Sequence, residues 1–223
     1  SYALDQAHEN YSDFDAEHIT FFPSARHAGP AEHLIQLRKA KEKLHIPLIG
    51  SLNCVHEETW CEYAVKMAET GIDALELNFY TNTTDFDATA ASIEDQHINV
   101  IRLVKAAIPI PVFVKLSPFY TNTLGLIAKL DKAGTNGFVL FNRLFQPDID
   151  VEKEEHHFPY NFSNENDNRL ALRYAGLLHN KLNGSIVANT GIMSGRDAIK
   201  MMLAGADAVQ IVSVIYKRGI QYI

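Results

Sequence analysis

The side chain with the clearest chemical potential is Lys115, which lies near the carboxyl end of the apolar run PVFVKLSPF, residues 111–119. Ligands of parallel βα proteins bind at the carboxyl ends of the strands, so a cation there favours an anionic or electron-rich partner. The alternative is a lysine that extends along the rim of the sheet and keeps its ammonium in water. We interpret Lys115 as a site residue.

Asparagines and an arginine follow two other apolar runs at the same relative position. Asn78 lies in DALELNFY, and Asn142 with Arg143 ends GFVLFNR. An asparagine carries both a hydrogen-bond donor and an acceptor, and a guanidinium could meet a carboxylate. The alternatives are asparagines that serve a turn or a helix cap and an arginine that covers the rim.

Two later segments resemble a phosphate site. Asn189 and Gly191 end the run SIVANTG, and Ser213 ends DAVQIVS. In barrels, backbone N–H groups of the loops after the last two strands hold phosphate together with the start of a short helix. Gly191 would permit close backbone approach and Ser213 could donate from its hydroxyl, whereas the alternative for Gly191 is a plain strand-ending turn. Ser51 and Asn53, which end IPLIGSLN, are expected to face the same cavity.

Short apolar runs must position these residues. Each run is rich in Val, Ile or Leu and too apolar for a strand with one wet face, which is typical of buried parallel strands. Helical patterns lie between the runs, and glycine or proline stands where a helix gives way to a strand. The predicted strands are IPLIGSLN from residue 46, DALELNFY from 73, IPVFVKLSP from 110, GFVLFN from 137, SIVANT from 185 and DAVQIVS from 207.

The alternation of strands and helices predicts an α/β fold with a parallel sheet. No GxGxxG follows a strand, which disfavours an open dinucleotide-binding sheet and favours a TIM (β/α)8 barrel. About six of the eight βα units are visible. Residues 1–45 read as a helical lead and a loop, and 46–223 as strands three to eight of one domain spanning 1–223. With only six of eight strands, we predict either a curved, unclosed barrel or a partner that fills the place of the two other strands.

Composition narrows the function classes. The formal net charge of −7 argues against nucleic acid as a partner, and no run suits a signal peptide or a membrane span. Cys54 and Cys61 form no CxxC pair, which fits reduced thiols and a cytoplasmic location. The polar stretch 146–168 shows neither a helical nor a strand period, which is typical of a lid or of a disordered loop. His156 and His157 in that stretch are interpreted as solvated residues, so no metal is predicted.

The order and spacing of these motifs resemble the dihydroorotate dehydrogenase family, specifically its dehydrogenase-like bacterial branch. The resemblance covers residues 30–223 and rests on IPLIGSLNC, DALELNFY, PVFVKLSPF, GFVLFNRLFQPDID and the closing ANTGIMSGRDAIKMMLAGADAVQIVSVIYKRG. It implies an FMN-binding barrel whose first two strands and last helix are absent here, so the chain would be truncated at its amino end. A homodimer or a partner chain would then complete the barrel.

The resemblance also implies roles for individual residues. A base would remove a proton from a dihydropyrimidine-type ring while a hydride passes to FMN, a reaction of pyrimidine biosynthesis. Lys115 matches the family lysine near the flavin, where it would stabilise negative charge. Substrate contacts fall to Asn78, Asn142 and Arg143, and cofactor contacts to a wider set: Ser51, Asn53, Lys115, Asn189, Gly191 and Ser213. Glu76 is interpreted as a partner in a polar layer inside the barrel.

The chain departs from the family most clearly at the position of the base. The family has a cysteine or serine in an SCPN-like loop, whereas this chain has YTNT with Thr81 at that place. A threonine hydroxyl relays a proton only when another group accepts it. Two other interpretations therefore stay open: a non-redox phosphate-binding barrel enzyme that uses Lys115, and a catalytically inactive fragment.

Overall fold

The apolar runs form one parallel sheet. The structure, a computed structural model, describes residues 30–54, 56–79, 85–143, 148–157 and 162–223. Six strands pair in parallel in the order β1-β2-β3-β4-β7-β8, which confirms the strands predicted from the sequence. Their bounds are β1 Ile49–Leu52, β2 Ala74–Phe79, β3 Val112–Leu116, β4 Gly137–Leu140, β7 Ser185–Asn189 and β8 Ala208–Gln210.

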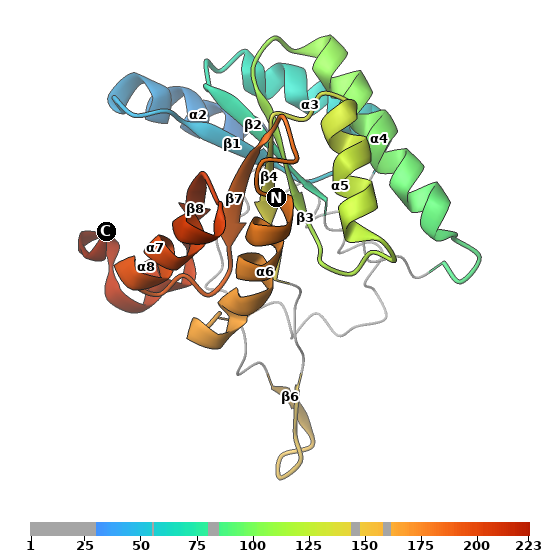
Figure 1. The fold of residues 1–223 in the computed structure, drawn as a ribbon. Coiled ribbons are helices and arrows are strands. Elements are labelled where there is room, and N and C mark those ends of the chain that lie inside the picture. Colours follow the sequence, from blue (N-terminus) through green and yellow to red (C-terminus); the bar gives the residue numbers. More distant parts are fainter. Residues whose placement is uncertain (1–29, 55, 80–84, 144–147, 158–161) are drawn as a thin grey trace.

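Helices cover the outer face of this curved sheet (Figure 1). None of the helices within the described ranges is long and apolar enough to cross a membrane. The α-helices are α2 Pro30–Lys43, α3 Glu57–Ala68, α4 Ala90–Ala107, α5 Thr123–Lys132, α6 Arg169–Leu178, α7 Gly195–Ala204 and α8 Ser213–Arg218, and the 3-10 helices are η2 Glu165–Asn168 and η3 Ile220–Tyr222.

The helix ends follow the expected local chemistry, with one difference in α4. Gly71, Gly134 and Gly205, which follow α3, α5 and α7, all have positive φ, as the predicted glycine turns require. The apolar period predicts α4 from about His97, but the helix begins at Ala90. The Thr89 hydroxyl accepts a hydrogen bond from the Ser92 backbone N–H, and the Thr89 N–H donates one to the Ser92 hydroxyl. This capping box starts two polar turns that carry no apolar period.

The two faces of the sheet have different environments. In β3 the side chains of Val112, Val114 and Leu116 are fully buried beneath the helices, whereas Phe113 and Lys115 point to the other face and are half-buried. Within the described residues β1 pairs only with β2, and β8 only with β7, so the sheet does not close. The prediction of a curved, unclosed barrel is confirmed.

The polar stretch 146–168 contains regular structure that the sequence did not predict. Strands β5, Asp148–Asp150, and β6, Glu155–His157, form an antiparallel hairpin that projects away from the sheet (Figure 1), and η2 follows it. With three residues each, β5 and β6 are too short to reveal a strand period. Asp148, His156 and His157 lie in this hairpin, and the described residues contain no group of three or more His, Cys, Asp or Glu side chains that could hold a metal ion.

A buried histidine of α4, His97, lies among aromatic rings. The His97 ring lies 4.3 Å from that of Phe79 and 5.8 Å from that of Tyr120, measured between ring centroids. Its Nδ1 lies 2.6 Å from the carbonyl oxygen of Ile93, and the side chain is 3% exposed. Burial lowers the pKa of His97, while the hydrogen bond to Ile93 and the nearby Glu94 act in the opposite direction.

The free energy of unfolding should therefore fall as the pH drops below about 6.5, the usual histidine pKa in an unfolded chain. In that window the unfolded chain takes up a proton that the folded chain does not bind, so the folded state loses up to about 1 kcal/mol by pH 5.5. Urea unfolding at several pH values measures this. His97→Phe should flatten that part of the profile, and His45→Gln, at an exposed site, should leave it unchanged. A profile that His97→Phe does not alter would contradict the assignment.

Candidate active site

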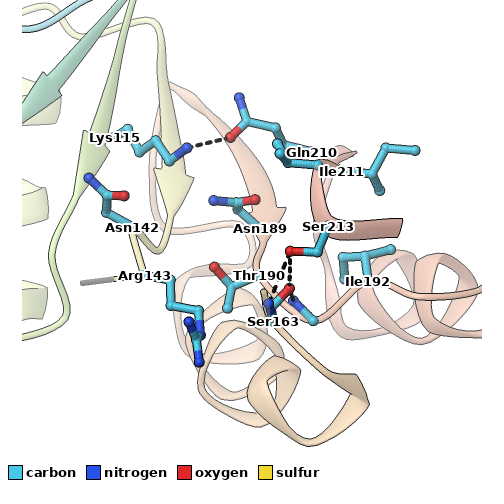
Figure 2. Close-up of a pocket in the computed structure, with 12 residues that line it drawn as sticks. Lys115, Asn142, Arg143, Ser163, Asn189, Thr190, Ile192, Gln210, Ile211 and Ser213 are labelled. Atoms are coloured by element: carbon cyan, nitrogen blue, oxygen red, sulfur yellow. Dashed lines mark hydrogen bonds between the residues drawn. The ribbon is translucent and has the colours of Figure 1, made fainter. Parts of the chain in front are cut away.

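A pocket opens where the strands β3, β4, β7 and β8 end (Figure 2). The structure brings six of the predicted site residues into its lining, although they are far apart in the sequence. Side chains of Lys115, Asn142 and Asn189 gather around this space. The pocket is lined by Lys115, Asn142, Arg143, Ser163, Asn189, Thr190, Gly191, Ile192, Gln210, Ile211, Val212 and Ser213.

Lys115 is held by a residue that the sequence did not single out. Its Nζ donates a hydrogen bond of 2.9 Å to Oε1 of Gln210, the last residue of β8. Burial lowers the pKa of the Lys115 ammonium, and the negative charge of Glu76 opposes that shift. The ammonium is thus partly withdrawn from water at the mouth of the pocket, where its field acts on a ligand with little screening.

Glu76 belongs to a polar layer inside the barrel, as interpreted from the sequence. It is 4% exposed, and its two carboxylate oxygens accept hydrogen bonds from Ser51 Oγ at 2.8 Å and from Gln210 Nε2 at 2.9 Å. Both carboxylate oxygens are satisfied by neighbours in the sheet. Glu76 therefore acts through its neighbours and is not placed as a base at the pocket.

The two predicted substrate asparagines meet across the end of β3. Asn142 Nδ2 donates a hydrogen bond of 2.7 Å to Oδ1 of Asn78, and the Asn142 backbone N–H donates one of 2.7 Å to the carbonyl of Leu116. Asn142 lines the pocket, while Asn78 stands behind it in β2, in register with Lys115. This hydrogen bond fixes which end of the Asn142 amide faces Asn78.

Arg143 lies at the pocket wall in an ion pair. Its Nε is 3.3 Å from Oδ2 of Asp167 in η2, and its side chain is 16% exposed. The pair joins the end of β4 to the segment before α6. Arg143 therefore adds positive charge to the wall, and Asp167 offsets part of that charge.

The predicted phosphate segments converge on Ser163. Its Oγ accepts a hydrogen bond of 3.2 Å from the Gly191 N–H and lies 2.9 Å from Ser213 Oγ, which also accepts the Ser163 N–H at 3.0 Å. The Lys217 ammonium donates to the Ser163 carbonyl at 2.9 Å. Ser163 belongs to the polar stretch 146–168, and nothing in that stretch marks it out from the sequence.

Gly191 is required for close packing as well as for its turn. Its φ is +73°, and a Cβ at this position would lie 2.6 Å from the Asn168 backbone nitrogen and 2.7 Å from the Asn164 carbonyl oxygen. The space beside its Cα is thus filled by backbone of the 164–168 segment. The Gly191 N–H still faces Ser163 at the pocket.

Two predicted site residues, Ser51 and Asn53, lie away from this pocket. Ser51 lines a second cavity, on the inner face of the half-barrel, which shares Gln210 with the pocket at the strand ends. Asn53 follows β1, is exposed and lines neither cavity, so the expectation that both residues face one cavity is wrong for this pair. The reason is the place of β1 in the sheet, because β1 is an edge strand and the pocket lies at the ends of β3, β4, β7 and β8. Thr81 falls outside the described residues.

Comparison with known sequences decides the family. A sequence model described as dihydroorotate dehydrogenase matches residues 23–223. The chain belongs to the dihydroorotate dehydrogenase family. It is 33% identical over 198 residues to dihydroorotate dehydrogenase B (NAD(+)), catalytic subunit, of Methanocaldococcus jannaschii, covering 86% of this chain and 64% of that protein. Over 190 residues it is 30% identical to dihydroorotate dehydrogenase A (fumarate) of Limosilactobacillus reuteri, covering 82% of this chain and 61% of that protein.

The fold agrees with a solved member of the dihydroorotate dehydrogenase family. A crystal structure of the Eimeria tenella enzyme in complex with ferulenol superposes with a TM-score of 0.61 at 17% identity, covering 85% of this chain and 59% of that one. This similarity confirms the partial TIM-barrel architecture. The chain thus spans less than two thirds of the length of these relatives.

Proposed function

We propose that this chain is the larger part of a flavin-dependent oxidoreductase that binds FMN and dehydrogenates a dihydropyrimidine-type ring in pyrimidine biosynthesis. The observation that carries the proposal is the half-buried Lys115 ammonium at a strand-end pocket in a chain of this family. When bound, FMN would supply the two-electron chemistry, and the chain would supply binding, orientation and charge.

The residues that line the pocket fit such a cofactor. Lys115 offers a cation to an electron-rich ring, and the amide of Asn189, held by its hydrogen bond of 3.0 Å to the Phe141 carbonyl, adds a fixed polar group beside it. The Ser213 hydroxyl could donate to a phosphate, and the Gly191 N–H, which donates to Ser163 Oγ in the structure, would have to turn from Ser163 to the phosphate. Ser51 would act through Glu76, to which it donates a hydrogen bond, and Asn53 would contact the cofactor from the end of β1.

The substrate would lie over Asn142. The Asn78–Asn142 hydrogen bond orients the Asn142 amide toward a flat ring, and Arg143 places positive charge where a ring carboxylate could lie. Thr81 stands at the position where the family resemblance implies a base, so it is our candidate for the proton transfer. A threonine that relays a proton needs an acceptor for it, which the substrate or another residue must provide.

The names of the relatives bear on the electron acceptor and on partner chains. The Methanocaldococcus relative is named as an NAD(+)-type catalytic subunit, and the Limosilactobacillus relative as a fumarate-type enzyme. We propose that a second chain, identical or different, covers the open edges β1 and β8, that residues 1–223 act as one domain, and that the protein works in the cytoplasm. We further propose that neither nucleic acid nor a membrane is a partner of this chain.

Flavin binding tests this function directly. The purified chain should carry bound FMN, or take it up when FMN is added, and its visible absorption should bleach under anaerobic conditions with dihydroorotate. A chain that takes up no flavin, alone or with the protein that covers its open edges, would refute the proposal. Borohydride trapping of a substrate on Lys115 would instead support the non-redox barrel enzyme.

A further inference from the structure

Gln210 stands between the two charged side chains inside the half-barrel. Its Oε1 accepts the hydrogen bond from Lys115 Nζ at 2.9 Å, and its Nε2 donates to Glu76 Oε2 at 2.9 Å. Among the ion pairs of the described residues, none joins Lys115 directly to Glu76. The amide of Gln210 is thus the connection between the ammonium and the carboxylate.

Only one orientation of the Gln210 amide suits this position. Turned the other way, its NH₂ donors would face the Lys115 ammonium, which has no acceptor, and its oxygen would face the Glu76 carboxylate. In the orientation present, the negative end of the amide dipole meets the cation and the positive end meets the anion. The two charges therefore hold the amide in place, and the amide holds the ammonium.

Glu76, at the other end of this connection, is also held in place. Glu76 is 4% exposed and needs partners for its charge, which Ser51 and Gln210 provide. The four side chains come from β1, β2, β8 and β3, so the connection joins the two edge strands to the strand that carries Lys115. A hydrogen bond to the charged form of a buried lysine favours that form.

We propose that Gln210 is a positioning residue that keeps Lys115 protonated and directed at the pocket by linking it to the buried Glu76 carboxylate. The role of Lys115 toward FMN rests on the function proposed above, but the link between Gln210 and the charge of Lys115 does not. A purely structural role, in which Gln210 only bridges the open side of the barrel, would leave the charge state of Lys115 unaffected.

Two substitutions with opposite expected signs separate these roles. Gln210→Leu removes the acceptor and should lower the pKa of Lys115 by about one unit, while Gln210→Glu places a carboxylate beside the ammonium and should raise it by about as much. The measurement is the 13Cε chemical shift in an alkaline titration of chain labelled at lysine, with the Lys115 signal assigned by its loss in Lys115→Arg. Gln36→Leu, the same change at an exposed residue of α2, is the matched control and should shift nothing.

Opposite shifts in the two variants support the positioning role. Equal pKa values in wild type, Gln210→Leu and Gln210→Glu, with only thermal stability altered, would overturn it. If Gln210→Leu fails to fold, Gln210→Glu and Gln210→Met carry the comparison. Because the titration needs no flavin, a chain that shows the opposite shifts but never binds FMN refutes the proposed function and leaves this inference standing.

Where FMN binds, a second readout follows from the same pair of variants. The reduction potential of bound FMN should be more negative in Gln210→Leu than in wild type, because a less firmly charged Lys115 stabilises added electrons less. Gln36→Leu should have the wild-type potential. A flavin potential that is identical in wild type and Gln210→Leu would contradict the role toward the cofactor.

Discussion

Lys115→Met is expected to lower turnover by the FMN-loaded protein by about 10²–10³-fold, the usual effect of removing one preorganised charge donor from a reacting centre. Methionine keeps the length and the apolar stem of the side chain, so the packing against Val139, its neighbour in register, is retained. What is lost is the positive charge beside Gln210 at the pocket mouth. Steady-state kinetics with FMN at saturation measure the loss separately from any weaker binding.

Two further variants test whether the loss of turnover comes from the charge of Lys115. Lys115→Arg should not restore activity, because a planar guanidinium cannot place a single donor where the ammonium meets Gln210 Oε1. Lys66→Met is the control, since Lys66 pairs with Glu62 on the outer helix α3 and should leave turnover unchanged. Turnover of Lys115→Met within about twofold of wild type would remove Lys115 from the machinery.

Gly191→Ala is expected to lower the free energy of unfolding by about 3 kcal/mol. An alanine at φ +73° costs about 1–2 kcal/mol, and its Cβ would press on the backbone of Asn164 and Asn168, which cannot move aside as the end of a flexible side chain can. The strain should also shift the Gly191 N–H that meets Ser163. Chemical denaturation measures the stability, and titration with FMN or inorganic phosphate measures the effect on the pocket.

Gly195→Ala provides the matched control. Gly195 is the first residue of α7, is exposed, and a Cβ there would meet nothing within 4 Å. Alanine suits a helix better than glycine, so this variant should be neutral or more stable by up to about 1 kcal/mol. Equal effects of the two substitutions would show that the crowding at Gly191 does not govern its packing.

The sheet could be predicted because each strand is recognisable from its own short run of residues. A strand covered on one side by helices and buried in a barrel is apolar on both faces, so runs such as GFVLFN stand out from the helices around them. The pocket could be predicted in part for the same reason, since Lys115, Asn142 and Asn189 each follow a recognisable strand. Parallel strands bring their carboxyl ends to one edge whatever the length of chain between them.

The rest of the site depends on contacts between distant segments, which a single sequence does not encode in any local pattern. Gln210 looks like an ordinary polar residue at the end of a strand until β8 is placed opposite β2 and β3. Ser163 lies in a polar stretch, and only the folded chain brings it to Gly191 and Ser213. Nor does the sequence show that the pocket lies at the ends of β3, β4, β7 and β8, away from Asn53 beside the edge strand β1.

The two open edges of the sheet bear on how this protein behaves in concentrated solution. An unpaired strand edge is a template for aggregation, and proteins limit that hazard with short edge strands and repulsive charge. Here β8 has three residues and β1 has four, and the chain carries a formal net charge of −7. Salt screens such charge. The chain should therefore remain dispersed at low ionic strength and self-associate as salt is added, so a purification in dilute buffer suits it best.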